Sequence, residues 1–281
     1  MRTREMARSD LGFAVECSRV AGRASATIEE LEGSLLNDAQ GCFIAENCHG
    51  PVGFCVAARY GKCGFLSAIA RGGFRSIAIV ERELLEQATA FLLNHGCDSI
   101  VAQAGHFIVP SFKSKGFQNH GRVLRFTGRV KSRSHQHIRA MKPQDLSAIG
   151  NLDKHCFRAD RSSLLERRYS LTPRFCKIFE TNGTIGGYIM AHKAKGVIAV
   201  GPWVVSSTVD CPMDLLEGLA LEAEGERLFV EVLETNRGAV ELLRAMGFVE
   251  SPEWGWRMHL GPRTGVGLDN ALYAIGSPFT G

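Results

Sequence analysis

The feature that most constrains this chain is a repeat within its own sequence. The segments Arg4–Leu11 and Arg139–Leu146 share the pattern R-x-M-x-x-x-D-L, at a displacement of 139 − 4 = 135 residues. Two more matches follow in the same order: Glu46…Gly53-Phe54 with Glu180…Gly187-Tyr188, and Lys115-Gly116-Phe117 with Met246-Gly247-Phe248. The displacement is the length of a domain and far exceeds the ~20–50-residue period of a solenoid. The sequence therefore predicts a duplicated domain.

The length of the chain suits two such domains. Its 281 residues are long for one core and comfortable for two of roughly 130–140 residues each. Residues 129–137 are polar and basic without an apolar period, which is typical of a linker. We therefore expect an N-terminal domain over 1–128, a linker over 129–137, and a C-terminal domain with an extended tail over 138–281.

Composition excludes several classes of protein. The linker lacks the interleaved aromatic residues of a nucleic-acid patch, and the net charge is only +4, so we expect no nucleic-acid partner. Nine cysteines occur without a CxxC pair, which predicts neither a disulfide framework nor a zinc site, and we expect no metal. No stretch reaches the ~18 apolar residues of a membrane span, and no apolar leader follows the first residues. We expect a cytoplasmic location.

Both copies predict strands and helices in the same order. In the first copy a capping box, Thr27-x-x-Glu30, begins a helix, and a hairpin turns at 47–50. The best helix of that half spans about 82–95, with Gly96 at its end. The other predicted segments are 42–45, 52–58, 65–69, 99–103, 175–179, 188–192, 197–205, 214–224, 228–233 and 236–246. An antiparallel meander followed by strand–helix–strand–helix is typical of a mixed α/β fold.

One segment of the second copy carries a family resemblance. In Leu228–Phe248 a strand leads to Asn236, with Ala239 three residues on, and a short helix then ends in Gly247-Phe248. This order resembles the last conserved motif of the GNAT acetyltransferases, and Phe112–Phe117 is a shorter echo in the first copy. The segment Leu152–Arg161 and the tail Leu272–Pro278 resemble a tandem GNAT subfamily of bacteria and archaea. The resemblance covers nearly the whole chain.

The resemblance implies two tandem acyl-CoA N-acyltransferase domains with a mixed α+β sheet. It implies acetyl-CoA bound where two parallel strands part, with its pyrophosphate on a glycine-rich turn at a helix N-terminus, where backbone amides and the helix dipole attract anions. It also implies direct acetyl transfer to an amine, with a base (often a Glu) and a Tyr that protonates the leaving thiolate.

The sequence departs from the family pattern at the phosphate turn. In the first copy the turn before the helix is predicted over 71–81. Six of its residues are the candidate cofactor-binding set: Arg75, Ser76, Ile77, Ala78, Ile79 and Val80. One alignment puts Ala78 and Val80 at the glycine positions, and another puts Ile79 and Glu81 there; branched side chains hinder close approach of a phosphate. Gly72-Gly73 lie just upstream and offer an alternative. The second copy has no glycine over 204–212 and carries Asp210, which opposes an anion.

Few residues remain for chemistry. His106, after the strand ending at Gln103, and Glu234 are the candidate catalytic groups. The alternatives are an exposed loop histidine and a solvated glutamate at the end of a strand. Asn236 either contacts the cofactor or caps its helix. Phe112 and Leu243 stand where the family often carries Tyr, and neither can donate a proton.

Three polar residues in the second copy leave two alternatives open. Asp153, Asp160 and Arg161 grip a polar substrate or each other.

Two functions remain open. The first is an N-acetyltransferase that binds acetyl-CoA through the first copy, with the second copy shaping a pocket for a small-molecule or other amine acceptor. The second is a catalytically degenerate tandem module that acts as a ligand sensor or interaction protein. The sequence names no acceptor and no oligomeric state.

Overall fold

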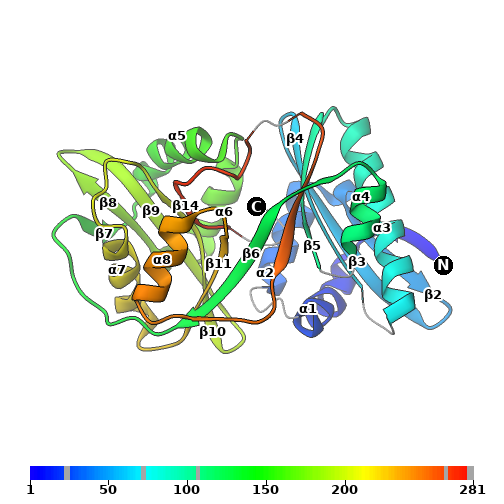
Figure 1. The fold of residues 1–281 in the computed structure, drawn as a ribbon, viewed down its shortest axis with the longest axis horizontal. Helices are drawn as coiled ribbons and strands as arrows, with labels where there is room; N and C mark the ends of the chain where they lie inside the picture. Colours follow the sequence, from blue (N-terminus) through cyan, green and yellow to red (C-terminus); the bar gives the residue numbers. More distant parts are fainter. Residues whose placement is uncertain (22–25, 71–73, 106–107, 263–264, 277–281) are drawn as a thin grey trace. The chain divides into compact units, whose positions relative to one another are not determined.

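The chain forms two compact units in a computed structural model that describes residues 1–21, 26–70, 74–105, 108–262 and 265–276 (Figure 1). Unit 1 comprises Met1–Arg122 and Trp254–Thr264, and unit 2 comprises Val123–Glu253 and Gly265–Ser277. Among the described residues, no helix combines the length and the apolar character that crossing a membrane requires.

Unit 1 is built on a mixed sheet in the order β1-β2-β3-β4-β5-β13, antiparallel except for the parallel pair β4–β5. Its strands are β1 (Arg2–Glu5), β2 (Cys42–Asn47), β3 (Gly50–Tyr60), β4 (Cys63–Ala70), β5 (Ser99–Ala104) and β13 (Gly255–Leu260). Its helices are α1 (Leu11–Val20), α2 (Ile28–Asn37), α3 (Phe74–Asn94) and α4 (Val109–Ser114). One apolar core lies under α3 and α4, and a second lies under α1 and α2.

Unit 2 repeats this plan with the order β6-β11-β10-β9-β8-β7, in which β10–β11 is the parallel pair. Its strands are β6 (Gln118–Gly128, from Val123 on), β7 (Ile138–Ala140), β8 (Cys176–Thr181), β9 (Thr184–Ala194), β10 (Val197–Val205) and β11 (Leu228–Leu233). Two short strands join it: β12 (Val249–Glu250) pairs with β6, and β14 (Leu272–Ala274) pairs with β10. Its helices are α5 (Leu146–Phe157), α6 (Ser162–Leu171), α7 (Met213–Ala223) and α8 (Arg237–Ala245). The mixed α/β class is confirmed.

The repeat reappears as identical side-chain geometry. In unit 1, Arg4 donates from Nη1 and Nη2 to the two carboxylate oxygens of Asp10 (2.7 and 2.9 Å) and from Nε to Glu46 (2.9 Å). Asp10 also accepts the backbone N–H of Ala7 at 2.8 Å. This arrangement ties the end of β1 to the start of α1 and to β2.

Unit 2 holds the same group of side chains. Arg139 donates to both oxygens of Asp145 (2.7 and 2.9 Å) and to Glu180, and Asp145 accepts the backbone N–H of Lys142 at 2.7 Å. The residues matched in the sequence are therefore matched in structure, atom by atom.

The two Gly-Phe motifs end their helices in the same way. The N–H of Phe117 donates to the carbonyl of Phe112 at 3.1 Å, and that of Phe248 to the carbonyl of Leu243 at 3.0 Å. The glycine before each phenylalanine has a positive φ (86° and 79°), which a residue with a Cβ rarely adopts.

Each unit takes a strand from the other half of the sequence. After the second Gly-Phe motif, β13 pairs with β5 of unit 1, from Trp256↔Ala104 to Leu260↔Ile100. After the first motif, β6 pairs with β11 of unit 2, from Val123↔Leu233 to Gly128↔Leu228. The compact units therefore differ from the contiguous ranges 1–128 and 138–281, because backbone pairing exchanges the strand that follows each motif.

The expected linker also belongs to a unit. Residues 129–137 contain no helix or strand, but the N–H of Arg133 donates to the carbonyl of Glu217 on α7 at 3.3 Å.

Helix α3 begins at Phe74, eight residues before the helix expected from the sequence. The reason is visible in its apolar face, since Ile77, Val80, Leu84 and Ala88 follow one another at helical spacing and all pack on the core under the helix. The predicted N-cap of α2 is confirmed, because the Thr27 hydroxyl accepts a hydrogen bond from the N–H of Glu30 at 3.2 Å.

Candidate cofactor site

The two parallel strands of unit 1 part before they end. They pair from Cys63↔Ser99 to Leu66↔Ala102, after which β5 continues beside β13 and β4 beside β3. Over the residues that the structure describes, no strand pairs with the β5-facing edge of β4 from Ser67 to Ala70. An open strand edge presents backbone N–H and C=O groups that an extended ligand with amide bonds can use.

The start of α3 lies next in the chain after this edge. In a helix that begins at Phe74, the amides of Phe74, Arg75 and Ser76 have no carbonyl partner within the helix. They point along the positive end of the helix dipole, which favours an anion such as a phosphate. Gly72-Gly73 fall on residues 71–73, outside the described residues.

The six expected cofactor residues divide at this helix start. Arg75 and Ser76 lie in the first turn, while Ala78, Ile79 and Val80 lie in the helix, where their N–H groups bond to carbonyls one turn back. Val80 is 4% exposed and packs on β3, and Ile77 packs on the same core. The loop expected over Arg75–Val80 is thus helical, because the apolar stripe of α3 extends through it.

Other expected positions are less informative. His106 lies outside the described residues. Phe112 and Leu243, which stand at the family's tyrosine positions, are 1% and 0% exposed in the cores of their units. Phe112 packs edge-on against Phe117. A tyrosine at either position would bury its hydroxyl in an apolar core.

Sequence reasoning missed a row of buried polar residues on the other face of the unit 1 sheet. They occupy adjacent strands: Ser67, Ser99, Gln103, Arg257 and His259. Ser99 Oγ lies 3.0 Å from His259 Nε2, and the Arg257 guanidinium lies 5.2 Å from the ring centroid of Phe65. Two of the five come from the exchanged strand β13, so their place here has no signal in the sequence.

The equivalent opening in unit 2 is filled. The strands β10 and β11 pair only from Ile198↔Leu228 to Val200↔Val230. Beyond that point β14 pairs with β10 at Trp203↔Ala274 and Val204↔Leu272, and the N–H of Ile275 donates to the carbonyl of Glu231 on β11 at 2.9 Å.

Asn236 holds this tail in place. Its Oδ1 accepts the N–H of Ala239 at 3.0 Å, which confirms the helix-cap interpretation. Its Nδ2 donates to the carbonyls of Asn270 (2.9 Å) and Leu272 (3.0 Å) in the tail. Glu234 follows β11 and is half-buried in the same unit. The candidate residues Glu234 and Asn236 therefore belong to unit 2, whereas Arg75 and Ser76 belong to unit 1.

Asp153 and Arg161 form a buried ion pair with each other. Arg161 donates from Nε and Nη2 to the two oxygens of Asp153 (2.9 and 2.7 Å), and the Tyr188 hydroxyl donates to Asp153 at 2.5 Å. All three side chains are 1% exposed or less, and burial raises the pKa of Tyr188 well above its ordinary value. Asp160 instead accepts hydrogen bonds from Ser162 at the start of α6. The buried group of Asp153, Arg161 and Tyr188 therefore stabilises the fold of unit 2.

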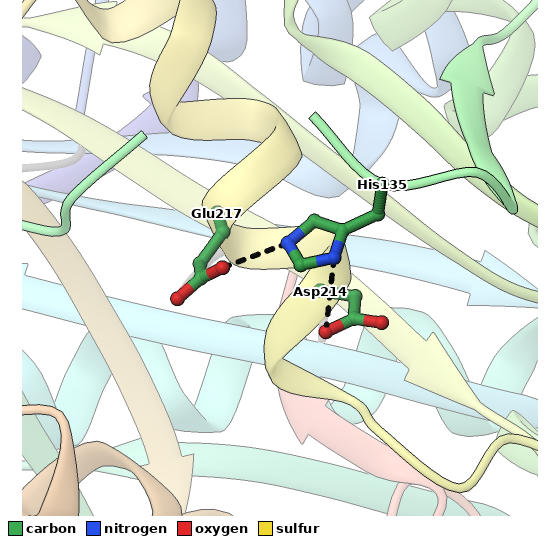
Figure 2. A group of neighbouring side chains, drawn as sticks. All are labelled: His135, Asp214 and Glu217. Carbon is green, nitrogen blue, oxygen red and sulfur yellow. Dashed lines mark hydrogen bonds and ion pairs between the residues drawn. The ribbon is translucent and has the colours of Figure 1, made fainter. Parts of the chain in front are cut away.

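One cluster has residue types that suit a metal (Figure 2). His135 Nε2 lies 2.7 Å from Glu217, and its Nδ1 lies 3.5 Å from Asp214, both on α7. Each ring nitrogen faces a different carboxylate, whereas a metal bonds one nitrogen and draws all its ligands to one point. These contacts explain why residues 129–137 lie against α7, and we assign the cluster that structural role.

Comparison with known proteins identifies the fold. The family model for the acetyltransferase (GNAT) domain matches residues 149–274. The match is confined to the second half of the chain, and the whole chain has the tandem GNAT fold. A search of curated proteins finds no match.

Three solved structures illustrate the likeness. A candidate acetyltransferase from Pyrococcus horikoshii is 18% identical, with a TM-score of 0.79 over 100% of this chain and 95% of its own. A GCN5-related N-acetyltransferase from Sphaerobacter thermophilus is 14% identical, with a TM-score of 0.65 over 98% and 96%. A tandem GNAT protein from the clavulanic acid biosynthesis pathway is 13% identical, with a TM-score of 0.60 over 92% and 97%.

Proposed function

We propose that unit 1 binds acetyl-CoA and transfers its acetyl group to an amine. The observation that carries this proposal is the open edge of β4 beyond Leu66, followed directly in the chain by the start of α3. An acyltransferase of this family needs those two features together, and unit 2 offers no equivalent open edge.

The residues of unit 1 fit the parts of acetyl-CoA. The backbone of Ser67–Ala70 can pair with the amides of an extended pantetheine arm, and the first-turn amides of α3 with a pyrophosphate. The basic residue Arg75 belongs to that turn. Acetyl-CoA would supply an activated thioester, and unit 1 would hold it extended and hold its anionic end fixed.

Proton transfer is the weakest part of the site. With Phe112 buried, no tyrosine stands at the family position, so the thiolate must take its proton from water or another group. The loss is tolerable because general acid help is worth typically ~10²–10⁴-fold. His106 remains the proposed base in unit 1. We expect slow transfer to a small-molecule or other amine, in the cytoplasm, where acetyl-CoA is made and all nine cysteines, each a free thiol in the structure, stay reduced.

A degenerate sensor or interaction module is the second candidate. It is favoured by the bulky residue Phe74 at the start of α3, where the family expects glycine nearby, and by the filled opening of unit 2. A sensor needs binding without turnover, and the two candidates therefore differ in whether acetyl groups reach an amine.

Titration calorimetry with acetyl-CoA tests the binding step of the proposal. Arg75→Glu should weaken binding by about tenfold, since reversing a charge beside a bound anion costs on the order of 1–2 kcal/mol. Arg82→Glu is the matched control, because this exposed residue lies two turns along the same helix, where the dipole effect has faded. Asp210→Ala in unit 2 should leave binding unchanged. Equal effects of Arg75→Glu and Arg82→Glu, or a response to Asp210→Ala, would place the ligand elsewhere.

A further inference from the structure

The chain's own tail occupies the opening between β10 and β11 of unit 2. Four backbone contacts hold it there: the ladder pairs Trp203↔Ala274 and Val204↔Leu272, the bond from Val205 N–H to the Ala271 carbonyl (2.9 Å), and the bond from Ile275 N–H to the Glu231 carbonyl (2.9 Å). The tail thus bonds to both parted strands, as an added strand would.

The side chains of this tail are part of the unit 2 core. Leu272, Ala274 and Ile275 are 4%, 1% and 5% exposed, and the ring of Tyr273 lies 5.1 Å from that of Trp203. Ile275 packs with residues of β6 and β11. Burial of this kind stabilises the docked tail through the apolar area removed from water.

Asn236 adds specificity for a peptide backbone. Both hydrogen bonds of its Nδ2 go to tail carbonyls, those of Asn270 and Leu272, while its Oδ1 caps α8. At 4% exposure, this side chain would leave a buried N–H donor without those carbonyls if the tail departed.

The start of α7, which corresponds in unit 2 to the phosphate-binding helix start proposed for unit 1, is also unsuited to an anion. At the start of α7, Pro212 has no N–H to offer, and Asp214 places a carboxylate in the first turn. Asp214 in turn lies 3.5 Å from His135. A pyrophosphate would meet a negative charge there instead of free amides.

We propose that the opening of unit 2 is a binding site for an extended peptide strand, filled in the intact chain by residues 269–275, and that it does not bind acyl-CoA. The location of cofactor binding in unit 1 rests on the proposed function, but the occupancy of unit 2 does not. The ligand class is a peptide with apolar side chains at the positions of Leu272, Ala274 and Ile275.

Cleavage of the folded chain tests this directly. A specific protease site is inserted between Pro262 and Gly265, the full chain is purified folded, and it is then cut, so that the fragment from Gly265 onward is held by contacts alone. Under native conditions this fragment should remain with the body of the protein in size-exclusion chromatography. It should exchange slowly with a fluorescent synthetic peptide of residues 268–277.

Two comparisons make the test decisive. Leu272→Asp puts a charge into the apolar core and should speed release of the fragment by at least about tenfold. An excess of acetyl-CoA should leave the release rate unchanged. Immediate loss of the wild-type fragment, or equal release with Leu272→Asp, would overturn the peptide site. Displacement by acetyl-CoA would show a gated cofactor site instead. Because retention of the fragment does not depend on acetyl-CoA, failure of the proposed acetyl-CoA binding to unit 1 would appear separately, in the titration.

Discussion

Asp153→Asn should be among the most damaging conservative substitutions in unit 2. The carboxylate accepts three hydrogen bonds, two from Arg161 and one from Tyr188, with all three side chains almost fully buried. The asparagine keeps one acceptor oxygen but turns an N–H₂ group toward a donor and removes the negative charge that faces Arg161. Breaking a buried ion pair by removing one partner costs about 3–5 kcal/mol. For a unit of this size that corresponds to a fall in Tm on the order of 10 °C.

Two variants calibrate the measurement. Tyr188→Phe removes one hydrogen bond to the charged oxygen and should cost about 1.5–3 kcal/mol. Asp160→Asn should cost less than about 1 kcal/mol, because the Asp160 side chain is 52% exposed and asparagine can still accept from Ser162 at the start of α6.

Urea unfolding followed by circular dichroism, with calorimetry for Tm, distinguishes the roles of this group. A free energy of unfolding for Asp153→Asn within about 0.5 kcal/mol of the wild type, accompanied by a raised KM for an acceptor, would refute the structural role. Asp153 and Arg161 would then be substrate ligands, the alternative that the sequence left open.

Three further outcomes follow from the fold. Hydrogen bonds from arginine hold the pKa of Asp10 and of Asp145 below the ordinary range, so both carboxylates stabilise the fold above about pH 4 and lose this effect as the pH falls through the lowered pKa values. Urea titrations between pH 7 and pH 3 should show the loss of stability, and replacing both residues by Asn should make the free energy of unfolding depend less on pH. The fragment 1–128 should fail to form a stable monomer in size-exclusion chromatography, because it lacks β13 and leaves β5 with an open edge, and fusing 254–264 to it should restore folding. Val80→Gly should lower stability by about 2–4 kcal/mol through a core cavity and a poor helix former, without tightening acetyl-CoA binding in calorimetry.

The sequence predicted those parts of the molecule that depend on local signals. The matched Asp10 and Asp145, the Thr27 cap and the two Gly-Phe helix ends were readable because capping and positive φ need particular residues at particular spacings. The bounds of β10 and β11 were also predicted correctly, since β10 has no charged residue and Glu231 is the one charged residue of β11.

Long-range pairing was beyond the same reasoning. Nothing local in Gly255–Leu260 indicates that this strand joins β5, more than 150 positions earlier in the chain, and a three-residue strand such as β14 has too few residues for a period to show. Among the residues near the candidate site, Arg257 and His259 could not be predicted from the sequence, because they belong to unit 1 only through the exchanged strand β13. The start of α3 was misplaced for a different reason: the glycine pattern of the family was given more weight than the helical spacing of Ile77, Val80 and Leu84.

A crystal structure of the protein grown with acetyl-CoA tests the central claim most directly. The account predicts ligand density in unit 1 alone, with the pantetheine arm along Ser67–Ala70 of β4 and the pyrophosphate at the first-turn amides of α3, while residues 272–275 stay paired with β10 in unit 2. Density for acetyl-CoA between β10 and β11, with the tail displaced, would contradict it.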